Sequence, residues 1–231
     1  MTVHARAAYD AIAADYDDRV APSSWVRERL WERLDALFPA GSRVLDVTAG
    51  TGLDTLHLLA RDVHVTACDL SPGMLAQIVR KAPDLRCRVA DVDRLEAAGL
   101  EGPFDGLIST FAGLNAASGL SGFARAAARL VRPGGVLFLH VLGRWRKRLR
   151  KTLSVRIAGI DVPHRLWSVR ELARAFAPGF ALSRIAGQGI LRPVDDAGKN
   201  ASLDRWERAV AELPVSRALG TFVSLELIRR G

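Results

Sequence analysis

Residues 43–52 read RVLDVTAGTG, and this stretch decides the fold. A short apolar run ends in the carboxylate of Asp46, a turn of small residues follows, and leucines then recur at positions 53, 56 and 59. This pattern predicts a buried strand that leads through a glycine loop into a helix. Glycine lets the backbone approach a ligand closely, and the free N–H groups at a helix start favour an anion. We therefore expect Gly50 and Gly52 to lie against a ligand.

A second predicted strand, residues 64–68, ends in Asp69, seventeen residues after Gly52. An acidic side chain at this place can accept both hydroxyls of a ribose, so the sequence indicates a nucleoside ligand. A dinucleotide-binding unit would need a small third residue in its G-x-G-x-x-G/A loop, and Thr55 stands there instead. The match to that class is therefore partial.

The carboxylate of Asp46, the turn 49–52 and the segment 69–75, which reads DLSPGML, together resemble small bacterial class I S-adenosylmethionine-dependent methyltransferases. The resemblance implies an α/β fold: a Rossmann-like, seven-stranded, mostly parallel sheet with helices on both faces. It also implies that the last strand is antiparallel and lies between strands five and six. The implied cofactor is S-adenosyl-L-methionine.

Thr48 departs from the family pattern D-x-G-x-G-x-G, because it occupies the first glycine position. Either the backbone there has a negative φ, or cofactor binding is weakened. We expect the first alternative. The second would fit a non-catalytic protein of the same fold.

The length of 231 residues, 49% of them hydrophobic, suits one well-packed core. We expect a single domain over 1–231. Its predicted parts are an N-terminal helical lid (1–40), a cofactor-binding half (41–142) and an acceptor-side half (143–231) with a basic insertion (143–166).

The composition limits where the chain can be located and which groups it can bind. No apolar run approaches the ~20 residues that cross a bilayer, and the first residues lack an apolar signal region, so we expect a cytoplasmic protein without a membrane span. Cys68 and Cys87 fall in predicted strands and suit buried thiols better than a disulfide or metal site. We expect no metal, and the sequence does not indicate an oligomeric state.

Three acids, Asp46, Asp69 and Asp91, close three successive predicted strands, and ligands of open parallel sheets bind at those ends. The resemblance implies that Asp91 accepts a hydrogen bond from the adenine amino group. It also implies that the backbone N–H of Val92 donates to a ring nitrogen of the adenine. The alternative for Asp91 is a helix cap or a solvated side chain. The cofactor-binding residues implied in all are Tyr16, Asp46, Thr48, Ala49, Gly50, Gly52, Asp69, Leu70, Met74, Asp91, Val92 and Thr110.

Further contacts come from the flanking segments. Residues 8–17 read AYDAIAADYD and resemble a family lead-in whose second tyrosine, Tyr16, folds over the cofactor. Leu70 and Met74 line the adenine pocket by the same resemblance, and Thr110 ends a strand that borders the sulfonium and the acceptor. Each of these side chains could instead only pack the core.

Methyl transfer from a sulfonium is an in-line displacement that gains most from alignment and water exclusion, so a dedicated base is optional. His140 and His164 are the candidate bases for an acceptor hydroxyl or ammonium. Asn115 is a candidate for orienting the acceptor. An isolated histidine is more often structural.

The net charge of +8 includes a cluster of basic side chains around Trp145. Its members are Arg144, Arg146, Lys147, Arg148, Arg150, Lys151 and Arg156. In this fold the cluster lies over the acceptor, which favours methyl transfer to an O or N atom of an acidic or phosphate-bearing small molecule. Nucleic acid or another polyanion is the alternative acceptor, because a basic run with a tryptophan can meet phosphates and stack a base.

Overall fold

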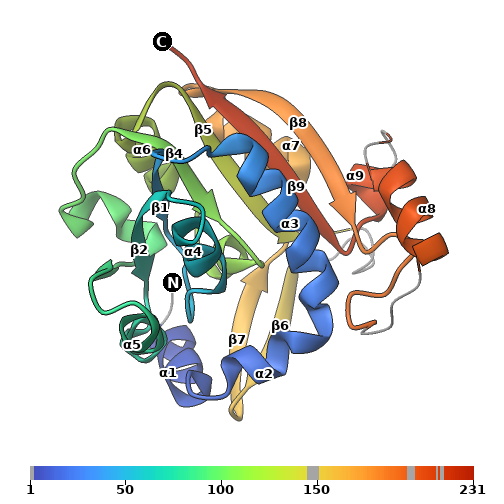
Figure 1. The fold of residues 1–231 in the computed structure, drawn as a ribbon, viewed down its shortest axis with the longest axis horizontal. Helices are drawn as coiled ribbons and strands as arrows, with labels where there is room; N and C mark the ends of the chain where they lie inside the picture. Colours follow the sequence, from blue (N-terminus) through green and yellow to red (C-terminus); the bar gives the residue numbers. More distant parts are fainter. Residues whose placement is uncertain (1–2, 145–150, 197–200, 212, 214–215) are drawn as a thin grey trace.

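The computed structural model describes residues 3–144, 151–196, 201–211, 213 and 216–231. Its main feature is a seven-stranded sheet in the order β3-β2-β1-β4-β5-β9-β8 (Figure 1). The pairs from β3 to β5 are parallel, whereas β9 runs antiparallel to both β5 and β8. The strands are β1 (Arg43–Asp46), β2 (His64–Asp69), β3 (Arg86–Val89), β4 (Phe104–Ser109), β5 (Val131–Leu142), β8 (Phe180–Gln188) and β9 (Phe222–Arg229). The predicted α/β fold with an antiparallel last strand is confirmed.

Helices cover both faces of the sheet. Neighbouring strand residues point to opposite sides, so each strand supplies side chains to both cores. Leu45 and Leu107 belong to the larger core, under α6 and α7, while Val44 and Ile108 pack under α3 and α4. The covering helices are α3 (Ser24–Leu37), α4 (Leu53–Leu59), α6 (Ser121–Leu130) and α7 (Val169–Phe176). The apolar strand sequences follow from this double burial. No helix in the described ranges has the length and apolarity that a bilayer crossing requires.

The N-terminal segment forms two helices and a 3-10 turn before α3. They are α1 (Val3–Ile12), α2 (Tyr16–Val20) and η1 (Ala21–Ser23). Asp10 fixes α1 to the start of α5 (Pro72–Lys81), since its Oδ1 accepts from Ser71 Oγ at 2.5 Å and from Gly73 N at 2.8 Å. A Cβ on Gly73 would come 3.0 Å from Asp10 Oδ1. The missing side chain therefore lets the two helices approach.

A β-hairpin occupies most of the predicted basic insertion. Its strands are β6 (Thr152–Ile157) and β7 (Ile160–Arg165). Val162 packs against Ala5 and Ala8 of α1, so the hairpin and α1 support each other. Arg156 is exposed and lies 3.8 Å from Asp161, while Arg144 lies 3.3 Å from Glu171. Residues 145–150 of the basic run lie outside the described residues.

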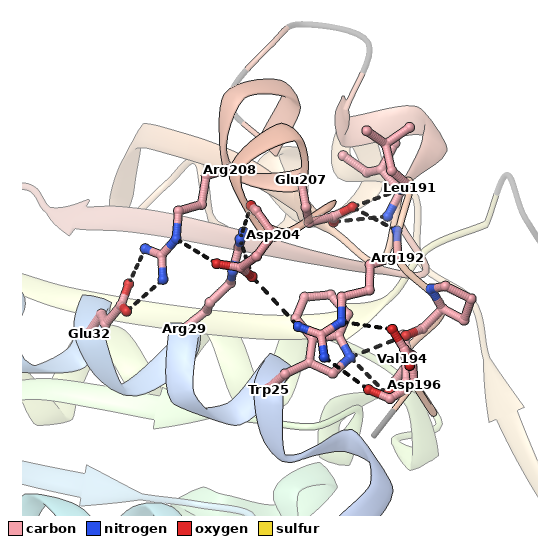
Figure 2. A network of polar contacts seen from close by, with 12 residues as sticks. Trp25, Arg29, Glu32, Leu191, Arg192, Val194, Asp196, Asp204, Glu207 and Arg208 are labelled. Atoms are coloured by element: carbon pink, nitrogen blue, oxygen red, sulfur yellow. Dashed lines mark hydrogen bonds and ion pairs between the residues drawn. The ribbon is translucent and has the colours of Figure 1, made fainter. Parts of the chain in front are cut away.

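Polar contacts hold α3 to the C-terminal part of the chain (Figure 2). Arg29 Nη2 donates to Asp204 Oδ1 at 2.7 Å, and Arg208 of α8 (Ala201–Ala211) bonds both oxygens of Glu32. The carboxylate of Glu207 accepts from three successive backbone N–H groups, those of residues 190–192. Glu207 is fully buried, so α8 has an inward face.

A loop follows β8. Its residues 193–196 lie against Trp25, whose Nε1 donates to the carbonyl oxygens of Pro193 and Val194 at 3.1 Å (Figure 2). Together with the ion pairs, this loop fixes the position of α3. The short helix α9 (Ser216–Leu219) follows before β9.

Candidate cofactor-binding site

The glycine loop takes the conformation that its residue types allow. Gly50 and Gly52 have φ of 55° and 90°, in the left-handed region that glycine enters without strain. Thr48 does not have a positive φ, as expected for a tolerated threonine. Its Oγ1 lies 3.0 Å from Ser109 Oγ, and a Cβ on Gly113 would clash with it. A glycine across the cavity therefore makes room for Thr48.

Asp46 supports this loop from below. Its carboxylate is fully buried and accepts from Thr55 Oγ1 at 2.8 Å and from the backbone N–H of Thr48 at 3.3 Å. Burial and the nearby carboxylate of Asp54 raise the pKa of Asp46 to about 7. Asp46 thus ties the glycine loop to α4 without lining the cavity described below.

Asp69 lies at the end of β2 with its carboxylate facing the cavity. One oxygen accepts the N–H of Gly50 and the other the N–H of Ser71, each at 2.9 Å. Burial raises the pKa of Asp69. An ionised carboxylate has about four acceptor positions, so it can accept ribose hydroxyls beside these backbone bonds. The backbone bonds hold the carboxylate in one orientation for that contact.

The cavity itself encloses about 720 Å³, counting its open mouth, at the carboxyl ends of the parallel strands. Eight of the predicted residues line it: Tyr16, Thr48, Ala49, Gly50, Asp69, Leu70, Met74 and Thr110. Tyr9 and Tyr16 of the N-terminal helices also close it, and burial raises the pKa of both phenols. Sequence reasoning found Tyr16 but not the lining role of Tyr9.

Asp91 and Val92 lie beside the cavity lining rather than in it. Asp91 caps η2 (Val92–Ala98), where its Oδ1 accepts from the N–H of Asp93 at 2.9 Å. Val92 is buried in the main core. Gly52 is also outside the lining, because it begins α4 and packs against Ile78. The adenine contacts of Asp91 and Val92 stay predictions.

A buried ion pair in the cavity wall was not foreseen. Arg27 Nη1 donates to Asp54 Oδ1 at 2.5 Å, and the same carboxylate accepts from Trp31 Nε1 at 2.8 Å and Thr110 Oγ1 at 2.6 Å. Burial acts to raise the pKa of Asp54, but Arg27 and these hydrogen bonds hold it below its ordinary value. Arg27 stands off the apolar stripe of α3, yet it is only 8% exposed.

The side chains of His140 and Asn115 form hydrogen bonds within the protein. His140 Nδ1 accepts from the N–H of Phe111 at 3.3 Å, so the proton sits on Nε2, 2.6 Å from Gln188 Oε1. Burial lowers the pKa of His140 to about 4. Asn115 Nδ2 donates to the carbonyl of Arg165 at 2.8 Å, and its Oδ1 accepts from Leu142 N at 2.9 Å. Neither residue lines the cavity, so no catalytic role is assigned to them.

His164 is buried on β7, and its Nδ1 lies 3.1 Å from the carbonyl oxygen of Val162. A carbonyl only accepts, so Nδ1 carries the proton and Nε2 keeps its lone pair. Burial lowers the pKa of His164, which keeps the ring neutral near pH 7. This is the protonation state a general base needs, although His164 does not line the cavity in this structure.

The comparison with protein families bears on which cofactor the cavity would hold. The family described as "Methyltransferase domain" matches residues 44–135, which run from β1 into β5 and include the glycine loop and Asp69. This match supports the resemblance to class I S-adenosylmethionine-dependent methyltransferases. It also supports S-adenosylmethionine as the cofactor that the resemblance implied. The nicotinamide-type alternative is set aside.

The relatives of this chain carry two different names. A demethylmenaquinone methyltransferase of Beutenbergia cavernae is 39% identical over 132 residues, or 56% of this chain and 54% of the relative. A malonyl-acyl-carrier-protein O-methyltransferase of Halorhodospira halophila is 42% identical over 95 residues, or 39% of this chain and 32% of the relative. The chain therefore spans about half the length of the first and about a third of the second.

A solved structure, the DhpI–SAH complex, shows the same fold across nearly the whole chain. Its TM-score is 0.67 with 20% sequence identity, and the match covers 96% of this chain and 93% of the DhpI chain. The likeness therefore extends beyond residues 44–135 and includes the N-terminal and C-terminal parts.

Proposed function

We propose that this protein transfers the methyl group of S-adenosylmethionine to an O or N atom of a small molecule, with acidic or phosphate-bearing acceptors as the first to test. The observation that carries the proposal is the enclosed cavity between the glycine loop, Asp69 and the N-terminal helices. An in-line transfer needs alignment and exclusion of water, and a cavity roofed by Tyr9 and Tyr16 supports both.

In this proposal the cofactor ribose binds Asp69, its adenine lies toward Leu70 and Met74, and the bound cofactor supplies an electrophilic methyl group. Asp91 and Val92 are the proposed contacts to the adenine ring from the end of the neighbouring strand. Residues 1–40 act as the lid and 41–142 as the cofactor-binding half. The lid is held by Asp17, which accepts from Lys81 Nζ at 2.6 Å and from Thr51 Oγ1 of the glycine loop.

The acceptor would enter on the side of the hairpin and of residues 113–116, in the acceptor-side half, 143–231. Asn115 joins these two segments through the carbonyl of Arg165, so it positions the acceptor wall. His164 on the inner side of the hairpin is the proposed base for an acceptor that carries a proton. The names of the two relatives divide between demethylmenaquinone and malonyl-acyl-carrier protein and thus do not agree on one acceptor.

The test is a transfer assay with labelled S-adenosylmethionine against a panel of small phenols, amines and carboxylic acids, with an RNA and a DNA oligomer in the same panel. We expect label in at least one small acceptor. A matched salt titration of oligomer binding separates the polyanion alternative. Submicromolar oligomer affinity with a steep salt slope, together with label in the oligomer alone, would contradict the small-molecule proposal.

A further inference from the structure

A groove separate from the cofactor cavity lies between α3 and α8, over the strands β5, β8 and β9. Counting its open mouth, it encloses about 880 Å³, and it shares no lining residue with the cofactor cavity. The small residues Ala186, Gly187 and Ala211 leave space that larger side chains would fill. The charged residues in its wall are Arg29, Glu32, Arg33, Arg184 and Arg208. Four cations against one anion make this wall basic.

The carboxylates around the groove do not balance its four arginines. The carboxylates that pair with them are Glu32, Asp204 and Glu226. Asp204 is shared by Arg29, at 2.7 Å, and Arg208, at 3.2 Å (Figure 2). Glu226 is shared by Arg33, at 2.5 Å, and Arg184, at 2.8 Å. Three carboxylates thus serve four guanidinium groups, which leaves one positive charge without a counter-charge among these residues.

Arg29 is the least satisfied of these cations. Its side chain is 8% exposed, and its guanidinium is held by Asp204 and by the ring of Trp25, 5.7 Å away. Within the described residues its Nε is enclosed without a hydrogen-bond partner, and its Nη1 has no partner either. Enclosed donors without an acceptor are costly and uncommon in native proteins, and a bound ion or water is one ordinary explanation. Arg29 therefore has donors for an acceptor that comes from a ligand.

Two more donors belong to side chains that line the same groove. Glu226 takes Nε and Nη2 of Arg33, whose Nη1 has no partner within the described residues. Gln188 accepts from Nε2 of His140 through its Oε1, at 2.6 Å, and its Nε2 has no partner in that same part of the chain. Arg29 and Arg33 are four residues apart on α3, where like charges repel, and an anion between them would relieve that repulsion.

The arrangement of these donors indicates the class of anion. They belong to three different side chains, and the Arg33 fork that would match a planar carboxylate is already occupied by Glu226. A phosphate group carries nearly two negative charges and three acceptor oxygens, so it can meet three separate donors at once. The lining also includes Leu30, Phe138 and Ala186, which can contact an apolar group attached to the phosphate.

We propose that this groove binds a small phosphate-bearing molecule, whose phosphate accepts hydrogen bonds from Arg29, Arg33 and Gln188. Because the groove and the cofactor cavity share no lining residue, both can be filled at once. The proposal does not depend on the proposed function.

The test is calorimetric titration with phenyl phosphate at one fixed ionic strength, with phenol as the uncharged control and inorganic phosphate as a second ligand. We expect one phenyl phosphate per chain with a Kd below about 1 mM, and no measurable binding of phenol. Tighter binding of phenyl phosphate than of inorganic phosphate would identify a phosphate ester as the ligand. Equal affinities would identify free phosphate, and either result supports a phosphate site. Equal binding of phenol and phenyl phosphate would overturn it.

Two variants and a control locate the site. Arg29→Gln and Arg33→Gln should each weaken phenyl phosphate binding by about 10- to 100-fold, the loss expected for a charged hydrogen bond. Both variants should fold, because Arg208 stays with Asp204 and Arg184 stays with Glu226. Arg61→Gln is the matched loss of charge, since this 57% exposed arginine pairs with Asp35 and lies outside the groove. It should keep the wild-type affinity.

Unchanged affinity in both groove variants, or an equal loss in Arg61→Gln, overturns the assignment. Displacement of phenyl phosphate by S-adenosylhomocysteine would also overturn it, because the phosphate would then lie in the cofactor cavity. Should a groove variant unfold, hydrogen exchange of the wild type decides: phenyl phosphate should slow exchange in α3 and α8, whereas slowing confined to residues 49–52 would contradict the proposal. Binding of phenyl phosphate without any binding of S-adenosylhomocysteine would count against the proposed function and leave the groove site standing.

Discussion

Replacing Asp69 with asparagine tests the ribose contact and separates it from a loss of folding. Each carboxylate oxygen accepts one backbone N–H at 2.9 Å, from Gly50 and from Ser71. Asparagine keeps one acceptor and presents an amide donor to the other N–H, which costs about 1–3 kcal/mol of stability. The lost charged hydrogen bond to the ribose corresponds to about 1.5–3 kcal/mol, or a roughly 10- to 150-fold weaker Kd.

The assay is calorimetric titration with S-adenosylhomocysteine, under conditions where urea unfolding shows each variant to be folded. The matched control is Asp105→Asn, near the start of β4, because Asp105 also accepts a backbone N–H, from Arg43 at 2.7 Å, and pairs with Arg132. This control should lose stability and keep its affinity. If Asp69→Asn binds as tightly as the wild type, or the control loses as much affinity, the ribose assignment is refuted.

Three further predictions concern the surroundings of the cavity. Because the pKa of Asp46 is raised to about 7 in the folded protein, the folded state keeps a proton that the unfolded chain has lost above about pH 4. The free energy of unfolding of the wild type relative to that of Asp46→Asn should thus fall by up to about 1.4 kcal/mol per pH unit between about pH 4 and 7. Urea unfolding measures this difference, and a difference that stays constant with pH would contradict the raised pKa. Gly73→Ala places a Cβ 3.0 Å from Asp10 Oδ1, so hydrogen exchange of α1 should speed up and S-adenosylhomocysteine should bind more weakly; unchanged exchange would show that the helix contact is not tight. Thr48→Gly should change cofactor affinity by less than about 5-fold, since Thr48 has no positive φ, and a variant that gains binding absent from the wild type would favour a non-catalytic protein.

The central half of the fold was predictable from sequence because each of its elements carries its own signal. The apolar strands end in acids or small turns, and serines begin two of the helices: Ser71 Oγ accepts from Met74 N at 3.0 Å, and Ser168 forms a capping box with Glu171. These are local patterns, and the parallel sheet follows from their order. Of the twelve residues predicted to bind the cofactor, eight line the cavity, and several of these lie at or just after those strand ends.

The parts that were missed depend on contacts between distant segments. The hairpin β6–β7 has its apolar side chains facing α1, some 150 residues away in sequence, and the many basic residues before it obscured that alternation. Arg27 stands on the polar side of its helix by periodicity, and only the fold shows that α4 places Asp54 beside it. His140 looked available in sequence, but the N–H of Phe111 and the side chain of Gln188 occupy both of its ring nitrogens.

Native mass spectrometry of the purified protein mixed with S-adenosylmethionine, and separately with NADH, tests the central claim most directly. The cavity closed over Asp69 predicts one S-adenosylmethionine per chain, with displacement by S-adenosylhomocysteine and loss of the bound mass in Asp69→Asn. NADH should not bind. A stable complex with NADH, and no complex with S-adenosylmethionine at any concentration up to about 1 mM, the weak end of ordinary substrate affinities, would contradict the account.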